Sequence, residues 1–237
     1  MKMLDEKFWE KYFKVYDVLN MVIPYQELME ELERELDSSA EDIVLDVGSG
    51  TGNLMMRIKN KAKKITGLDF SKTGIDSHKE KDPGADVLLF DITEKLPFSD
   101  DYFSKVVSNN TIYTLNFDQQ RKVLFEIYRI LKPGGKFVVS NVIKDFSPIK
   151  IYTDHVIKSI QKKGIIRTIA SIFILLLPTI KMFYYNMMIK NSGATKNYNF
   201  FRKGEQKKVL ENIGFKNVSE DKFVYSNQGI MNSCYKI

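Results

Sequence analysis

One ten-residue stretch, IVLDVGSGTG at residues 43–52, constrains the fold of this chain more than any other. Its apolar first half predicts a fully buried strand, which runs directly into three glycines, Gly48, Gly50 and Gly52. Glycine accepts positive φ and leaves no side chain in the way of a ligand. A helix predicted at residues 53–59 adds unpaired N–H groups and a positive dipole end, and Asp46 adds a carboxylate. These features together indicate a site for a nucleotide-like cofactor.

Strands and helices alternate along the first 142 residues. Two helices are expected at the start, at residues 5–21 and 24–36, and another at 118–131. Apolar runs predict five strands, at residues 43–47, 64–69, 85–90, 102–108 and 136–142. This alternation favours a parallel, doubly wound α/β sheet.

The alternation stops after Val142 for about sixty residues. It resumes with a predicted helix at 204–213 and two strands near 218–225 and 232–237. We therefore expect three parts: N-terminal helices that cover the cofactor site, a core interrupted once, and a basic, apolar helical insertion. Their boundaries are 1–40 for the helices, 41–143 and 204–237 for the core, and 144–203 for the insertion.

Charge is distributed unevenly along the 237 residues, whose net charge is +6. Residues 144–203 hold 11 Lys and Arg against 2 acids, a net of +9, whereas residues 1–142 hold 20 basic and 24 acidic residues, a net of −4. A basic segment on a mildly acidic domain suggests an anionic partner. The single cysteine, Cys234, excludes an internal disulfide and a Cys-x-x-Cys metal site, so no metal is expected. The N-terminus lacks the apolar core of a signal peptide. Together with the single cysteine, it predicts a cytoplasmic location.

Polar residues are predicted at the carboxyl ends of four consecutive strands, where open parallel sheets bind ligands. An acid at the end of the second strand, Asp69, stands where a carboxylate can accept both hydroxyls of a ribose. Asp91, after the third strand, is placed to accept a hydrogen bond from an adenine amino group. Ser108, Asn109 and Asn110 close the fourth strand. An Asp after a strand is commonly only a helix cap, but four such ends in order favour a cofactor site.

Four motifs in order carry a resemblance to a known family: VLDVGSGTGN, TGLDFS, FDITEKLPFSDDYFSKVVSN and EIYRILKPGGKFVVSN. They are similar to the motifs of class I S-adenosylmethionine-dependent methyltransferases, in the ubiquinone/menaquinone-biosynthesis branch (methyltransferase type 11). The resemblance covers residues 12–142 and the last thirty residues. It implies a Rossmann-like seven-stranded sheet with an antiparallel last strand, and S-adenosyl-L-methionine as the cofactor.

The same resemblance implies roles for individual residues. Asp69 is expected at the ribose with Phe70 beside the adenine, Asp91 and Ile92 at the adenine, and Asn109 near the sulfonium. The segment YDVLN resembles the N-terminal YD-x-x-N helix of the family, which places Tyr16 over the cofactor. The methionine end is expected to be held by Asp46, Gly48, Ser49, Gly50 and Gly52.

Groups for the acceptor side are less well defined by the sequence. Methyl transfer from a sulfonium needs chiefly alignment, and a general base only for some acceptors, so no catalytic residue is assigned. Asn110, Tyr113 and His155 are substrate-side candidates, although Tyr113 and His155 also fit packing roles. His78, within SHKEKD, is expected to be solvated. A dinucleotide site fits less well, because the glycines are spaced G-x-G-x-G and no second nucleotide half follows.

The insertion contains the segment IIRTIASIFILLLPTIKMFYYNMMI at residues 165–189. Its uncharged part spans 13 residues, 168–180, and contains Pro178, short of the roughly 20 apolar residues of a spanning helix. Clustered Lys and Arg beside apolar residues are typical of a segment that lies on anionic lipid, peripherally on the inner membrane face. A lid or a dimer interface is the alternative, and nucleic acid is the least favoured partner.

The leading hypothesis is thus a methyltransferase for a lipophilic acceptor, a prenylated quinone precursor or a phospholipid head group. A soluble small-molecule methyltransferase with a lid and a non-catalytic S-adenosylmethionine-binding interaction protein are the alternatives.

Overall fold

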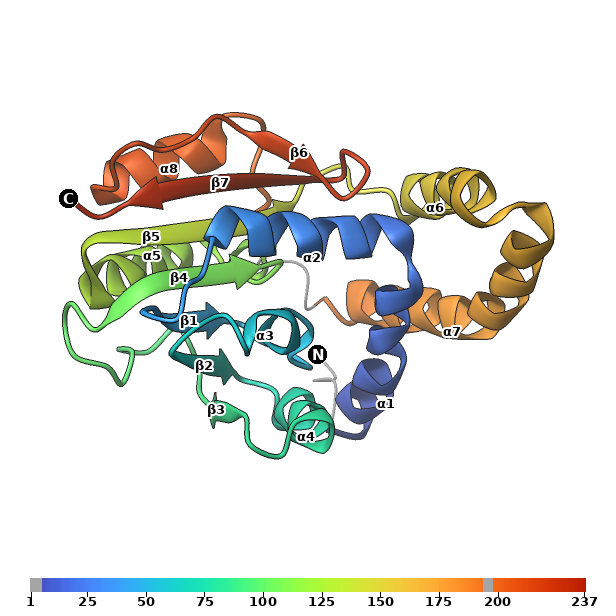
Figure 1. Cartoon of the computed structure of the whole chain (residues 1–237), viewed down its shortest axis with the longest axis horizontal. Coiled ribbons are helices and arrows are strands. Elements are labelled where there is room, and N and C mark those ends of the chain that lie inside the picture. Colours follow the sequence, from blue (N-terminus) through green and yellow to red (C-terminus); the bar gives the residue numbers. More distant parts are fainter. Residues whose placement is uncertain (1–5, 194–197) are drawn as a thin grey trace.

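One seven-stranded sheet forms the centre of the protein in the computed structural model, which describes residues 6–193 and 198–237 (Figure 1). The strands follow the order β3-β2-β1-β4-β5-β7-β6. Neighbours from β3 to β5 pair in parallel, and β7 is antiparallel to both β5 and β6. The strands are β1 (Ile43–Val47), β2 (Lys64–Asp69), β3 (Asp86–Leu89), β4 (Phe103–Asn109), β5 (Leu131–Val142), β6 (Lys222–Val224) and β7 (Gly229–Tyr235). The doubly wound sheet with an antiparallel last strand is therefore confirmed.

Helices cover both faces of this sheet (Figure 1). They are α1 (Glu6–Tyr16), α2 (Ile23–Leu36), α3 (Asn53–Ile58), α4 (Lys72–Lys81), α5 (Phe117–Ile130), α6 (Pro148–Lys163), α7 (Ile165–Ser192) and α8 (Glu205–Ile213), with 3₁₀ turns η1 (Asp17–Met21) and η2 (Ile112–Thr114). The α5 and α8 side shares a core with Leu45 and Val47 of β1, whereas Val44 packs with α2 on the other side. Because side chains alternate along a strand, Asp46 faces the α2 side.

Several predicted boundaries shift in the structure. The strand predicted from residue 136 begins already at Leu131, and its pairing with β4 is irregular between Phe103 and Lys105, where Gly134 takes a φ of 77°. The strand predicted at 218–225 is reduced to β6. The first predicted helix ends at Tyr16 and continues as η1, and its predicted start at Asp5 lies outside the described residues.

The insertion forms a helical hairpin, α6 followed by α7, that projects away from the sheet (Figure 1). Pro148 opens α6 within its first turn, as proline does at helix starts. Gly164, with a φ of 78°, makes the reversal between the helices. The helix α7 then runs for 28 residues, and Pro178 lies inside it. Its part Ile165–Ile189 is long and apolar enough to cross a membrane by length and composition. The 13-residue count made from the sequence therefore underestimates the continuous apolar helix.

Only a narrow stripe of α7 is buried in the protein. Thr168, Leu175, Met182 and Ile189 are each at most 8% exposed, and they recur every seven residues. Residues seven apart lie on the same side of a helix, two turns away from each other. Most of the remaining surface of α7 is apolar and exposed. This helix is therefore attached along one edge and open around the rest.

An arginine on α5 holds the loop that follows β3. Arg129 donates hydrogen bonds to the carbonyl oxygens of Leu96 and Phe98 and forms ion pairs with Asp100 and Glu126, both at 2.7 Å. Glu126 in turn accepts the Leu96 N–H at 2.8 Å. A lysine has a single ammonium group and cannot replace the several N–H donors of the planar guanidinium.

We expect Arg129→Ala to lower the free energy of unfolding by about 2 kcal/mol, because buried carbonyl acceptors and Glu126 lose a charged donor. Urea unfolding measures this loss. Arg121→Ala, at an exposed position of the same helix, is the matched control and should change stability by less than about 0.5 kcal/mol. Equal effects of the two substitutions would show that the loop does not depend on Arg129.

Candidate functional site

The glycine turn after β1 is held against the end of β2. The N–H groups of Gly48 and Ser49 both donate to the carbonyl oxygen of Leu68, at 2.8 and 2.9 Å. The Gly50 N–H donates to the Asp69 carboxylate at 2.8 Å, and the Ser71 N–H donates to the other oxygen at the same distance. Asp69 therefore lies at the turn, as predicted, with its backbone partners already fixed.

The three glycines of the turn serve different purposes. All have positive φ, 82° at Gly48, 53° at Gly50 and 78° at Gly52. A Cβ at Gly48 would lie 2.0 Å from the Thr111 hydroxyl, and one at Gly52 would lie 2.2 Å from the His78 ring. At Gly50 the same position has no atom within 4 Å among the described residues. Gly48 and Gly52 thus permit close packing inside the protein, whereas Gly50 keeps a space open at the turn.

The position of His78 differs from the prediction that it is solvated. Its side chain is 1% exposed and packs against Gly52, and burial lowers its pKa. The reason is that SHKEKD forms part of α4, one face of which packs toward the glycine turn. The adjacent Lys79 and Glu80 are exposed.

Asp46 is a buried carboxyl group at the carboxyl end of β1. It is 2% exposed, and burial together with the negative charge of Asp69 raises its pKa from 3.8 to about 7. Burial also raises the pKa of Asp69, against its two backbone hydrogen bonds. Two neighbouring acids that are costly to ionise favour a ligand that brings positive charge or hydrogen-bond donors.

Three polar atoms near the strand ends are buried without a partner within the described ranges. They are Ser49 Oγ, Asn109 Oδ1 and Ser140 Oγ. Asn109 of β4 pairs with Ser140 of β5, and the pleat directs both side chains to the α2 side, as for Asp46. Buried polar atoms are normally hydrogen-bonded, so these are the atoms that a bound ligand would satisfy. Ser140 was missed from the sequence, where only its position near the end of the fifth strand could have indicated it.

The predicted adenine-side residues lie on the loops after β2 and β3. Phe70 is 67% exposed, and Ile92 is 8% exposed. Asp91 is exposed and accepts hydrogen bonds from the N–H and hydroxyl of Thr93 at 2.9 and 2.8 Å. A role for these residues at an adenine stays a prediction.

The N-terminal segment YDVLN closes over the glycine turn. Asp17 accepts a hydrogen bond from the Thr51 hydroxyl at 2.7 Å and pairs with Lys81 of α4 at 3.0 Å. Asn20 donates to the side chain of Asn53, at the start of α3, at 2.9 Å. Tyr16 is the first residue of this segment and the last of α1, and its side chain is partly exposed. A position of Tyr16 over the cofactor stays a prediction, and the sequence did not indicate the contacts of Asp17 and Lys81.

The substrate-side candidates have different surroundings. Asn110 takes a left-handed φ of 53°, a strained conformation that often occurs at functional sites, and its N–H donates to Ser140 at 2.8 Å. Tyr113 follows in η2, partly exposed. His155 is 2% exposed and accepts the Ile23 N–H at 3.1 Å, which joins α6 to α2. This hydrogen bond gives His155 a role in packing. A role of His155 toward a substrate stays a prediction.

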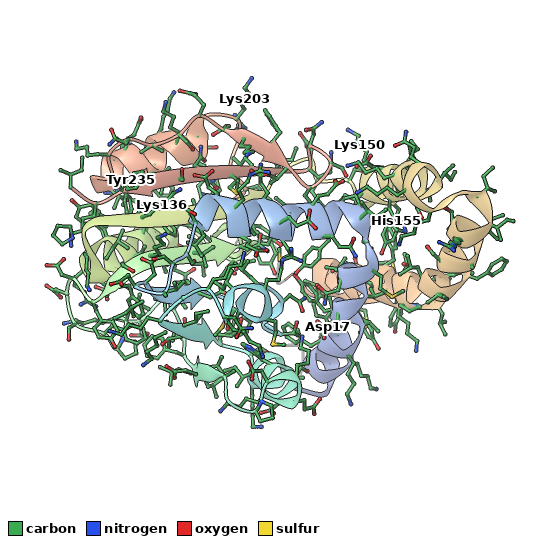
Figure 2. The ribbon with its side chains drawn as sticks, viewed as in Figure 1. Asp17, Lys136, Lys150, His155, Lys203 and Tyr235 are labelled. Carbon is green, nitrogen blue, oxygen red and sulfur yellow. The ribbon has the colours of Figure 1, made fainter. Side chains whose placement is uncertain are left out.

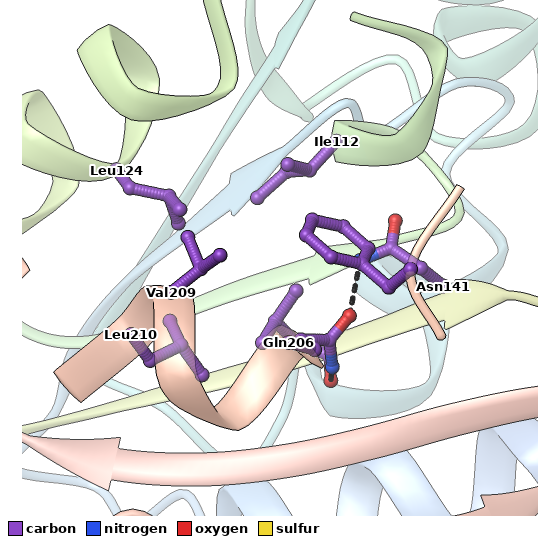
Figure 3. Close-up of a pocket in the computed structure, with 8 residues that line it drawn as sticks. Ile112, Leu124, Asn141, Gln206, Val209 and Leu210 are labelled. Atoms are coloured by element: carbon purple, nitrogen blue, oxygen red, sulfur yellow. Dashed lines mark hydrogen bonds between the residues drawn. The ribbon is translucent and has the colours of Figure 1, made fainter. Parts of the chain in front are cut away.

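Two pockets lie outside this site. One lies among core side chains between α5, β5 and α8 and is closed by the 2.8 Å hydrogen bond from Asn141 to Gln206 (Figure 3). The other, of about 320 Å³, is lined by residues such as Lys136 and Tyr235. Figure 2 places these two residues at the opposite end of the molecule from Asp17 and His155. Within the ranges that the structure describes, no group of three His, Cys, Asp or Glu side chains could hold a metal ion.

Comparison with known proteins identifies the family and the fold. Residues 45–139 match the family model described as a methyltransferase domain. The demethylmenaquinone methyltransferase of Renibacterium salmoninarum is 32% identical over 119 residues, 49% of each chain. The ubiquinone/menaquinone biosynthesis C-methyltransferase UbiE of Rickettsia prowazekii is 32% identical over 177 residues, 63% of this chain and 67% of that one. A Haloferax volcanii methyltransferase, solved with the activator Trm112, matches the fold with a TM-score of 0.67 over 99% of each chain at 15% identity.

The chain belongs to the class I S-adenosylmethionine-dependent methyltransferases, in the ubiquinone/menaquinone branch. It spans about half the length of the first curated relatives that it matches. S-adenosylmethionine is the cofactor of this family, and the residues present fit it. Gly50 leaves space at the turn, Asp46 offers a carboxyl group to an ammonium, and the orphan hydroxyl of Ser49 offers a hydrogen bond.

Asp46 gives the site a pH dependence whose sign follows from its raised pKa. The folded protein keeps this proton up to about pH 7, whereas the unfolded chain loses it near 3.8, so the cofactor-free protein loses stability as the pH rises between these values. At pH 8, Asp46→Asn should therefore raise Tm by about 2–4 °C for each kcal/mol recovered, while it weakens cofactor binding. Thermal unfolding and calorimetry of S-adenosylhomocysteine binding measure the two effects. A variant that is less stable and binds normally would contradict the assignment.

Proposed function

We propose that the protein transfers a methyl group from S-adenosylmethionine to the ring of a prenylated quinol, a lipophilic acceptor that it meets at a membrane surface. The observation that carries this proposal is the α6–α7 hairpin, which exposes a large apolar surface beside the cofactor site. The names of two relatives, a demethylmenaquinone methyltransferase and a ubiquinone/menaquinone biosynthesis C-methyltransferase, support a quinol ring over a phospholipid head group.

The exposed apolar surface of the hairpin is unusually concentrated. Of 24 large apolar side chains that are exposed in the described structure, 15 lie on α6 and α7. Ile166 is 85% exposed, Phe173 71% and Leu177 60%. Contiguous apolar surface of this kind marks an interaction site. Since the buried stripe of α7 attaches it to the protein along its length, a position within the membrane interface suits it better than a span surrounded by lipid.

Basic side chains accompany this apolar surface. Lys163, Arg167 and Lys181 are exposed on the hairpin, and Lys150 lies near its start (Figure 2). Lys158 is partly neutralised by Glu27 and Asp154, at 2.5 and 2.8 Å. Exposed cations beside apolar residues favour anionic lipid as the partner, because each adds about 1 kcal/mol of attraction at such a surface. A second copy of this basic surface would be repelled.

The inner edge of the hairpin reaches the cofactor site. Met182 packs in one apolar cluster with Tyr16, Tyr113 and Phe200. Tyr185 contacts Phe8 and Tyr12 of α1, with ring centroids 5.5 and 6.4 Å apart. An acceptor with its tail along α7 would therefore have its head group beside the strand ends.

The residues of the site bind and align in this proposal. S-adenosylmethionine, when bound, supplies an electrophilic methyl group on a sulfonium. The glycine turn and Asp69 hold the cofactor, YDVLN covers it, and the aromatic surroundings exclude water, so the chain contributes chiefly proximity and orientation. Attack by a ring carbon would form the C–C bond as the bond from the methyl group to sulfur breaks, which leaves S-adenosylhomocysteine, and the ring proton would be released to solvent as aromaticity returns.

Membrane association is tested by cosedimentation with vesicles that contain anionic lipid. Replacing Lys162, Lys163 and Arg167 by Gln should lower the partition coefficient on the order of tenfold or more. The control replaces exposed Lys122, Lys132 and Lys216, which removes the same charge elsewhere. If the wild type and both variants pellet equally poorly, the hairpin is a lid of a soluble enzyme. If light scattering instead shows dimers that form through α7, a second copy of the chain covers the apolar surface of the hairpin.

Catalysis is tested with a short-tailed demethylmenaquinol embedded in vesicles, with radiolabelled S-adenosylmethionine as donor. We expect a labelled quinone that is one methylene unit heavier by mass spectrometry, and a rate at least tenfold lower for Phe173→Ser/Leu177→Ser, because the reaction occurs at the membrane. Quinone extracts from cells with and without the protein should differ by the same mass. Tight cofactor binding without product from any quinol would favour the non-catalytic binding protein.

A further inference from the structure

Half of the twelve tyrosines of the chain gather on one side of the sheet, beside the cofactor turn. We call these six residues the tyrosine cluster; they are Tyr12, Tyr16, Tyr25, Tyr113, Tyr198 and Tyr225. They come from α1, α2, η2 and the segments around α8 and β6, which are far apart in the sequence. Such convergence of one residue type from distant elements needs a physical reason.

Ring contacts join the members of the cluster. The rings of Tyr12 and Tyr16 lie 5.9 Å apart, and those of Tyr25 and Tyr225 lie 6.1 Å apart. Tyr113 contacts Tyr198 edge-on at 5.6 Å and Phe200 at 5.0 Å. The six tyrosines thus form three aromatic pairs, and each pair stabilises the packing of its two rings.

The tyrosine cluster lies at the strand ends that carry orphan polar atoms. Tyr16 and Tyr113 pack in the same apolar cluster as Val107 and Val138. These two valines precede Asn109 and Ser140 by two positions, so all four side chains point to the same face of the sheet. The Tyr113 N–H is fixed by the side chain of Asn141 at 3.1 Å, directly after Ser140. The tyrosines and the orphan atoms of Asn109 and Ser140 therefore belong to one region.

The cluster is neutral and still partly open. Tyr16, Tyr113 and Tyr198 each keep part of their surface exposed, unlike ordinary core residues. Burial and the neighbouring phenols raise the pKa of Tyr16 and Tyr113, and burial raises that of Tyr198, so their hydroxyls remain protonated at neutral pH and can donate hydrogen bonds. A cluster of rings and neutral hydroxyls matches a flat, uncharged, hydroxylated ring. A phosphate group would instead require cationic partners.

We propose that the tyrosine cluster, with Asn109 and Ser140, is the subsite that binds the aromatic diol ring of the acceptor, and that Tyr113 and Tyr198 select it by hydrogen bonds to its hydroxyls. This inference rests on the proposed function, since it places the acceptor ring beside the same cofactor turn. It assigns specificity to Tyr198, which no sequence motif indicates. The orphan atoms of Asn109 and Ser140 supply further partners for the same ring.

The test uses 1,4-naphthalenediol, the ring without a tail, under anaerobic conditions with protein saturated with S-adenosylhomocysteine. Calorimetry should show saturable binding to the wild type, and Tyr113→Phe and Tyr198→Phe should each weaken it by about five- to tenfold, the effect of one hydrogen bond. With naphthalene, which has no oxygen to accept a hydrogen bond from Tyr113 or Tyr198, the wild type and these variants should bind alike. Tyr235→Phe, at the far end of the molecule (Figure 2), is the matched control.

Each result decides the proposal. Equal affinity of the wild type and both variants for the diol, or no saturable binding at all, would overturn it, and unchanged affinity for S-adenosylhomocysteine shows that the variants are folded. Diol binding with the expected pattern but without methylated quinol from vesicles would leave the ring subsite standing and remove the proposed function. Normal KM for the vesicle-borne quinol in all tyrosine variants would remove the subsite and leave the function standing.

Discussion

The hydrogen bond from the Gly50 N–H to the Asp69 carboxylate is the interaction on which the rest of the site depends. It joins the turn after β1 to the end of β2, and it uses the acid that is predicted to hold the ribose. With Asp69 fixed there, Asp46 becomes costly to ionise, and the turn presents Gly50 to open space. The strand order reverses between β1 and β4, which is the topological switch point of the sheet. Ligands of open α/β sheets bind at this point, between the loops of the two halves of the sheet.

The core of the fold could be predicted because its signals are local. Apolar runs of strand length, glycines after a strand and acids at strand ends each report on a few neighbouring residues, and the sheet confirms them. His78 shows where this stops: a histidine among charged residues looks solvated, yet the helix turns it against Gly52. Ser140 shows the same limit, since its orphan hydroxyl matters only because β5 pairs with β4. Both depend on contacts between distant segments.

The sequence predicts that the insertion is helical and apolar, but not that one long helix runs through most of it. Charges and Pro178 divide its sequence into short apolar pieces, whereas the structure continues one helix through them, since exposed lysines do not interrupt helical hydrogen bonding. The seven-residue stripe of buried side chains follows from packing against α6 and α1, which no local pattern specifies.

The helix α1 and the residue that follows it contact both the exposed hairpin and the cofactor turn. Tyr12 of α1 lies against Tyr185 of α7, and Asp17, directly after α1, binds Thr51 of the cofactor turn. If a ligand at the cofactor turn binds more tightly when α1 is in this position, it changes the affinity of the hairpin for its own partner. The partner of the hairpin then changes the affinity of the ligand by the same factor, because such coupling is reciprocal. A ligand at the cofactor turn and a partner of the hairpin that both prefer this position of α1 would therefore each strengthen the binding of the other.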